Sequence, residues 1–158
     1  INYINDGNIY FEQQNILSTN MDDWRKNFNY YQQHSYLFNR SIEENICYPY
    51  TKITDDKRNI LKEVGVYNLI EEIIMKKNNS KLSGGQMQII LLIRLLFSYK
   101  KFILLDEPTA SLDHTTKKYV IQIINFLKKR GCCLIIVTHD KEIMDIVDNV
   151  IDLSEKNN

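Results

Sequence analysis

The chain is poor in the residues that cross-link or interrupt a fold. It has 5 glycines, 2 prolines and 3 cysteines among 158 residues. Cys132 and Cys133 are adjacent, so with Cys47 they do not make a disulfide framework, and we expect all three to be reduced thiols. No pair of cysteines or histidines has the spacing of zinc ligands, and the sequence therefore indicates no structural metal site.

The chain also lacks an excess of charge and a long apolar run. Lys and Arg together number 20, and Asp and Glu together also number 20, so the formal net charge is zero. No basic face for nucleic acid is therefore expected. The most apolar segment, Ile89–Phe97, carries Arg94 and is far shorter than the roughly 20 residues that span a bilayer. The polar start of the chain does not resemble a secretory signal. With 44% hydrophobic residues, the composition is that of a single soluble domain.

Hydrophobic periodicity divides the chain into strands and helices. We expect strands at Ile1–Ile4, Ile9–Glu12, Phe28–Tyr31, Phe102–Leu105, Leu134–Val137 and Val150–Leu153, the first two joined by a turn at Asn5–Asn8. We expect helices after a capping box at Ser41 and Glu44, then at Asp55–Val64, Tyr67–Met75, Gln86–Ser98, Thr115–Lys129 and Lys141–Val147. The alternation of strand and helix after Phe102 predicts a parallel α/β sheet with helices on its faces.

Two of the five glycines precede the apolar helix, in Ser83-Gly84-Gly85-Gln86. Backbone N–H groups and the positive end of a helix dipole at such a turn can bind phosphate, and Ser83 adds a hydroxyl. A plain serine N-cap after a flexible loop explains the same residues. The segment alone leaves both interpretations open.

Polar side chains follow two apolar strands at the point where each strand ends. Asp106 and Glu107 follow Phe102–Leu105, where Asp106 could hold Mg²⁺ and Glu107 could polarise an attacking water. His139 follows Leu134–Val137 and would lie beside this pair, within reach of a phosphate or the same water. A solvated acidic turn and a structural histidine are the alternatives.

A glutamine also closes an earlier strand. Gln33 follows Phe28–Tyr31, and its amide could reach a metal or a water. By itself, a glutamine at a strand end is weak evidence for a functional site.

Taken together, these segments resemble the motifs of the ATP-binding cassette (ABC) ATPases, in the order of that family. They are Gln33 with Tyr36-Leu37-Phe38 (Q-loop), Lys81–Gln86 (signature), Leu104–Thr109 (Walker B), Ser111–Asp113 (D-loop) and Thr138–Asp140 (switch histidine). The resemblance covers nearly the whole chain.

The resemblance implies a P-loop NTPase (RecA-like) α/β fold, with a parallel sheet, helices on both faces and an inserted α-helical subdomain. The 158 residues would form a single incomplete ABC ATPase domain. Residues 1–38 would be a remnant of the core lobe, 39–95 the helical subdomain and 96–158 the rest of the core lobe.

The resemblance also implies ATP hydrolysis by a head-to-tail dimer. Asp106 would help to hold Mg²⁺, and Glu107 would be the general base. His139 would contact the γ-phosphate, and Gln33 would sense the metal and couple the site to a transport subunit.

Other residues would act across the dimer. The signature residues Ser83, Gly84, Gly85 and Gln86 would contact ATP bound to the second nucleotide-binding domain, and Asp113 would bridge the two sites. The expected partners are this second domain and a transmembrane domain, which would place the chain at the cytoplasmic face of a membrane. Nucleic acid is not an expected partner.

The sequence departs from the family pattern in two ways. No G-x-x-x-x-G-K-[ST] loop (Walker A) occurs in it, and Gly7 stands alone in a stretch that resembles the residues just after the P-loop helix. The chain therefore looks like a C-terminal portion, and we expect it not to bind ATP productively by itself. In addition, basic residues usually follow the signature in the family, but this sequence has Met87, Gln88 and Ile89 there. Arg94 provides a basic residue further along the same expected helix.

The motifs leave the biological role open. Leu37–Ile46 resembles the segment after the Q-loop in exporters, which favours export over import. One alternative is a naturally short, non-hydrolysing interaction module that uses Ser83–Gln86 only in trans. Another is a lobe of a DNA-repair or chromosome ATPase, which the short separation of Gln33 and Ser83 disfavours because it leaves no room for a coiled-coil insertion.

Overall fold

The structure is a computed structural model of the chain. It describes residues 7–11, 13–15, 18, 20, 22, 25–32, 36–75, 82–98 and 100–153. The expected strand Ile1–Ile4, the loop before the signature and Gln33 lie outside these ranges.

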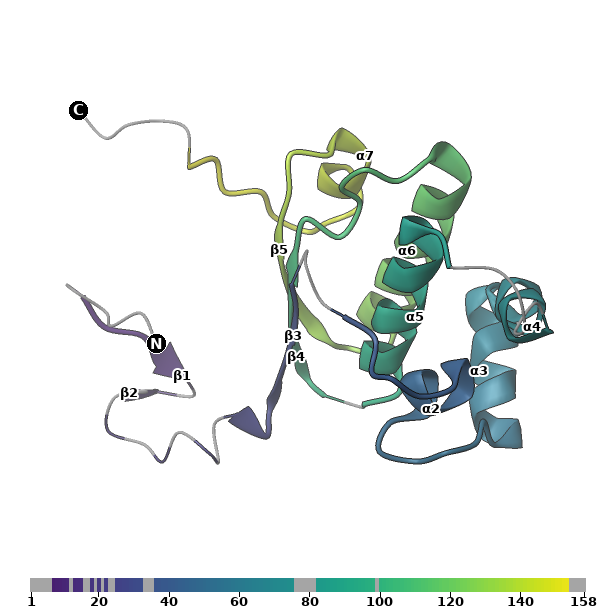
Figure 1. The fold of residues 1–158 in the computed structure, drawn as a ribbon. Coiled ribbons are helices and arrows are strands. Elements are labelled where there is room, and N and C mark those ends of the chain that lie inside the picture. The colour runs from purple at the N-terminus through teal and green to yellow at the C-terminus, as the bar shows by residue number, and fades with distance from the viewer. Residues whose placement is uncertain are drawn as a thin grey trace.

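A three-stranded parallel sheet forms the centre of the fold (Figure 1). Its strands are β3 (Phe28–Tyr31), β4 (Phe102–Asp106) and β5 (Cys133–Val137), in the order β3-β4-β5. Tyr30 is opposite Leu104, which is opposite Ile135. The predicted parallel α/β fold is thereby confirmed, and the carboxyl ends of all three strands lie at the same edge of the sheet.

Six helices lie to one side of this sheet in the described ranges. They are α2 (Ile42–Cys47), α3 (Asp55–Val64), α4 (Tyr67–Met75), α5 (Gly84–Leu96), α6 (His114–Lys129) and α7 (Lys141–Met144). Helices α3 and α4 lie farthest from the strands (Figure 1). The capping box of Ser41 and Glu44 is confirmed at the start of α2. The bounds of α3 and α4 are those that the apolar spacing predicts.

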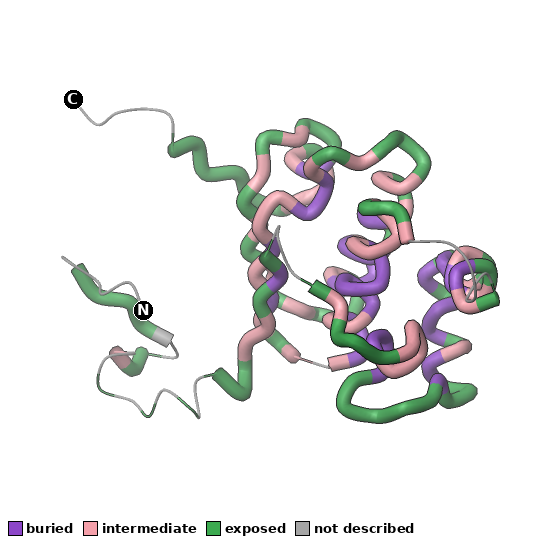
Figure 2. Tube along the Cα trace, viewed as in Figure 1, coloured by how far each residue is buried: buried purple, intermediate pink, exposed green. Residues whose placement is uncertain are grey.

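The core centres on α5 and extends from the sheet to the facing sides of α2, α3, α4 and α6. The α5 residues Ile89, Ile90, Leu92 and Ile93 are completely buried, because this helix contacts β3, α2 and α6 on different sides. Figure 2 shows buried residues along α5 and the facing sides of its neighbours. Burial of large aliphatic side chains is the main stabilising contribution here.

The opposite face of the sheet is uncovered among the described residues. Strand side chains alternate between the two faces, and on the open face Tyr30, Ile135 and Val137 are 57%, 55% and 60% exposed. Helices on both faces are expected for the fold, but in the described ranges α5 and α6 pack against one face only (Figure 1).

The ends of the chain differ from the sequence predictions. The structure has a hairpin that pairs β1 (Tyr10–Phe11) with β2 (Gln14–Asn15), whereas the predicted turn at Asn5–Asn8 lies partly outside the described residues and stays a prediction. Val150–Leu153 forms no strand and is exposed, because no strand of the described ranges pairs with it. Helix α7 ends at Met144, earlier than the predicted Val147.

Candidate functional site

The carboxyl ends of β4 and β5 bring Glu107 and His139 together. The two strands pair in parallel up to Asp106 and Val137, and the Glu107 N–H donates to the Val137 carbonyl at 2.9 Å. This register places His139 Nδ1 2.9 Å from Glu107 Oε1. Two side chains that the sequence singles out separately therefore form one pair at the edge of the sheet.

The two carboxylate oxygens of Glu107 are in different environments. Oε1 contacts His139, whereas Oε2 is buried and has no hydrogen-bond partner among the described residues. Buried polar atoms usually have partners, so such an oxygen is a candidate acceptor for a proton from a ligand or a water. Glu107 also has φ 47°, in the left-handed region that is uncommon for a residue other than glycine and that is often found at functional sites.

Asp106 provides a second carboxylate at the same edge. The Tyr30 hydroxyl, on the neighbouring strand, lies 3.4 Å from Asp106 Oδ2. Partial desolvation of the hydroxyl and the negative charge of Asp106 raise the pKa of Tyr30, although much of its ring is exposed. Within the described ranges no group of three or more His, Cys, Asp or Glu side chains is arranged so that it could hold a metal ion. One carboxylate fits the way Mg²⁺ is held in nucleotide enzymes, where substrate phosphates and waters complete the coordination.

The signature residues form the N-terminus of α5. Ser83 is the N-cap: its hydroxyl accepts from the Gln86 N–H at 3.1 Å, and the Gln86 side chain accepts from the Ser83 N–H at 3.0 Å. Helix α5 begins at Gly84 and not near Gln86, because this capping box includes both glycines in the first turn. The hydroxyl proton of Ser83 and the first backbone N–H groups have no acceptor within the helix, so capping and anion binding are compatible.

Asp113 is the N-cap of α6. Its carboxylate accepts from the Thr116 N–H at 3.0 Å and from the Thr116 hydroxyl at 2.7 Å, and these bonds lower the pKa of Asp113. The signature lies against this turn, since a Cβ on Gly85 would be 2.9 Å from Thr116 Cγ2 and 3.3 Å from Leu112 Cδ2. The expected D-loop is therefore in contact with the N-terminus of α5 in the same chain.

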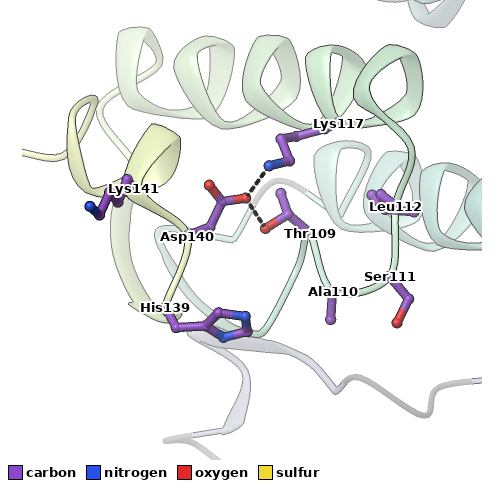
Figure 3. Close-up of a pocket in the computed structure, with 8 residues that line it drawn as sticks. All are labelled: Thr109, Ala110, Ser111, Leu112, Lys117, His139, Asp140 and Lys141. Carbon is purple, nitrogen blue, oxygen red and sulfur yellow. Dashed lines mark hydrogen bonds and ion pairs between the residues drawn. The ribbon is translucent and has the colours of Figure 1, made fainter.

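A hollow of about 370 Å³ opens beside His139 (Figure 3). It is lined by the segments that follow β4 and β5 and by one side chain of α6, namely Thr109, Ala110, Ser111, Leu112, Lys117, His139, Asp140 and Lys141. Lys117 was not among the sequence candidates, and Thr109 entered only as the last residue of the expected Walker B segment, with no role assigned to it. No periodicity or motif indicates which lysine of α6 points toward the end of β5.

The family model for ABC transporters matches residues 2–110 of the chain. The chain belongs to the ABC transporter family. The match ends before Ser111, so the assignments of Asp113 and His139 depend on the motifs and the geometry alone.

Relatives from several organisms extend the similarity over most of the ABC transporter chain. The chain is 30% identical over 154 residues to the probable iron export ATP-binding protein FetA of Escherichia coli. This alignment covers 93% of the chain and 66% of that protein. The chain is also 30% identical to the ABC transporter ATM1 of Plasmodium falciparum, over 98% of the chain and 15% of the relative. The chain thus spans less than two thirds of each of these relatives.

A solved structure supports the fold. A bacterial Atm1-family ABC exporter with ATP bound superposes with a TM-score of 0.73 over 90% of the chain and 26% of that protein, at 23% identity. This likeness confirms the predicted P-loop NTPase fold. In the described part of the chain, no helix is long and apolar enough to cross a membrane.

Proposed function

We propose that these residues belong to an ATP-hydrolysing domain that powers an ABC exporter. The observation that carries the proposal is the contact of His139 with Glu107, at 2.9 Å, beside a buried carboxylate oxygen that has no partner in the described ranges. A carboxylate held in this way can accept a proton, which is what activation of water requires.

In this mechanism Glu107 accepts a proton from the attacking water. The water oxygen forms a bond to the γ-phosphorus, the bond from that phosphorus to the β,γ-bridging oxygen breaks, and ADP and phosphate result. His139 donates a hydrogen bond to the γ-phosphate, where negative charge must be stabilised. Its side chain is 84% exposed, so it is accessible to a nucleotide.

Asp106 would hold Mg²⁺ together with the phosphates, and Gln33 is a second proposed ligand. When bound, this ion neutralises phosphate charge. The position of Asp106 at the end of β4, directly before Glu107, supports this assignment.

The signature residues act on ATP bound to a second nucleotide-binding domain. Ser83 and Gly84 are exposed at the N-terminus of α5, where the helix dipole favours an anion. Gly85 and Gln86 complete this turn, and Asp113 lies beside it. We further propose a transmembrane partner and a place at the cytoplasmic face of a membrane, because FetA is named as an export protein and the solved neighbour is an exporter.

The printed sequence contains no P-loop motif, so we propose that the 158 residues do not hydrolyse ATP by themselves. The P-loop would be supplied by other residues of the full-length protein. A non-hydrolysing module that acts only in trans is the second candidate, favoured by the combination of an exposed signature turn and no P-loop motif.

Ser83→Arg in the full-length protein tests this function. We expect phosphate release from MgATP to fall by about 100-fold or more, because a bulky cation replaces a phosphate-binding hydroxyl in trans. Thr54→Arg is the matched control, since Thr54 is the exposed N-cap of α3 and its loss weakens a helix without affecting the site. Equal activity of the two variants would contradict the proposed role of the signature. No phosphate release by the unmodified full-length protein would favour the second candidate.

A further inference from the structure

Three elements beside the hollow are connected through their side chains (Figure 3). They are α6, which carries Lys117, the start of α7, which Asp140 caps, and the segment after β4, which carries Thr109. Asp140 Oδ2 lies 2.9 Å from Lys117 Nζ and accepts a hydrogen bond from the Thr109 hydroxyl at 2.8 Å. Asp140 Oδ1 accepts from the Glu142 N–H at 3.0 Å, at the start of α7. Lys117 Nζ also lies 3.2 Å from Glu142 Oε1. We call Lys117, Asp140 and Thr109 the bracket.

The bracket is shielded from solvent, unlike an ordinary surface ion pair. The side chains of Lys117 and Asp140 are 21% and 13% exposed, and Thr109 is 5% exposed. Burial alone would raise the pKa of Asp140, but the bonds from Lys117 and Thr109 outweigh it and lower that pKa. Exposed ion pairs contribute little, whereas shielded pairs with additional hydrogen bonds hold their geometry more firmly.

Each end of the bracket adjoins a residue of the candidate site. Asp140 directly follows His139. Lys117 lies one helical turn after Asp113 on α6, and its N–H bonds to the Asp113 carbonyl at 2.9 Å. Thr109 lies two residues after Glu107. A displacement of the N-terminus of α6 would therefore move Lys117 and, through its ion pair with Asp140, the backbone that carries His139.

We propose that Lys117 and Asp140 are positioning residues, which hold His139 against Glu107 and transmit movement of the D-loop to His139. The proposal rests on the proposed function for its biological meaning, since the D-loop adjoins the second nucleotide site only in the dimer. The contact itself is a property of this chain and needs neither ATP nor a partner. A role confined to capping α7 is the alternative, and in that case His139 would be unaffected when the ion pair is removed.

The side-chain ¹⁵N signals of His139 distinguish these two roles. The chain is labelled with ¹⁵N-histidine, its three histidines are resolved, and the His139 signals are assigned with His139→Gln. Glu107→Gln supplies the reference for His139 without its carboxylate partner. We expect Asp140→Asn and Lys117→Met to shift the Nδ1 signal from the wild-type position toward this reference. Lys117→Arg, which keeps the cation, should retain the wild-type signal.

Lys118→Met is the matched control, because Lys118 is the exposed neighbour on the same helix. It should leave the His139 signals unchanged. Folded Asp140→Asn and Lys117→Met variants with wild-type His139 signals would overturn the proposal, as would a Glu107→Gln reference identical to the wild type. Failure of Lys117→Met to fold would also overturn it, because the bracket would then be a requirement for folding. The ATPase assay of Ser83→Arg is independent of these results, so the two proposals can fail separately.

Discussion

Gly85 shows at the scale of a single residue how closely the signature helix approaches its neighbour. A Cβ there would meet Thr116 Cγ2 at 2.9 Å, a distance that real Cβ atoms essentially never adopt. Thr116 cannot easily rotate away, because its hydroxyl bonds to Asp113 at 2.7 Å. The absence of a side chain at Gly85 is therefore a packing requirement, separate from any contact with nucleotide.

Gly85→Ala should lower the free energy of unfolding by about 1–3 kcal/mol, the cost of overpacking a close contact. Gly84→Ala is the matched control, because a Cβ on Gly84 would meet nothing within 4 Å. The control should be neutral or stabilising by up to about 1 kcal/mol, since alanine favours the helix. Urea unfolding of both variants measures the difference, and equal stabilities would contradict the close approach of α5 to α6 at this glycine.

The carboxylate of Asp140 should make stability depend on acid pH. Its pKa in the folded chain is lower than its ordinary value, so its contribution is fully present above a pH of about 4 and is lost as the pH falls toward the lowered pKa. Asp140→Asn should therefore be less stable than the wild type at neutral pH, and the two should converge in acid. Urea midpoints across this range test the expectation, which parallel curves would contradict.

At the scale of elements, Asn45 and Arg94 fasten α2 to α5. Asn45 is 1% exposed; its side chain accepts from the Phe38 N–H at 2.8 Å and donates to the Phe38 carbonyl at 3.0 Å. Arg94 donates to the Asn45 carbonyl at 2.8 Å and to its side-chain oxygen at 2.7 Å, and it lies over the Phe38 ring. Burial lowers the pKa of Arg94. The segment after the expected Q-loop is thus joined directly to the signature helix.

Asn45→Ala should cost about 2–4 kcal/mol, because it leaves several buried donors and acceptors without partners. Asn59→Ala, on the exposed side of α3, is the matched control and should be neutral or slightly stabilising. Thermal or urea unfolding gives both values. A small effect at Asn45 would mean that α2 and α5 are held together mainly by their apolar contacts.

Helices with clear caps could be predicted from the sequence, whereas elements that depend on a partner could not. Thr54 caps α3, and Gly65, with φ 86°, ends it, so local chemistry defines both bounds. Val150–Leu153 has the composition of a strand, but a strand requires a neighbour to pair with. The meeting of Glu107 and His139 was predictable, because parallel strands end at one edge. The link from Lys117 to Asp140 was not, because it depends on how α6 packs.

At the scale of the whole molecule, the sheet has one packed face and one open face. On the open face, Tyr30 and Ile135 are large, exposed side chains in one row across the three strands. The described helices cover only the other face. The chain belongs to the ABC transporter family, and Asp106, Glu107 and His139 lie at the carboxyl edge of the sheet. The sequence contains no G-x-x-x-x-G-K-[ST] motif.

The most direct test of the account is MgATP turnover by the full-length protein carrying Glu107→Gln. We predict a loss of about 10²- to 10⁴-fold in the rate of phosphate release, because the proposed general base is removed, while ATP binding is retained. Glu63→Gln, at an exposed position of α3, should keep the wild-type rate. Turnover by Glu107→Gln at the wild-type rate would contradict the assignment of Glu107 as the base.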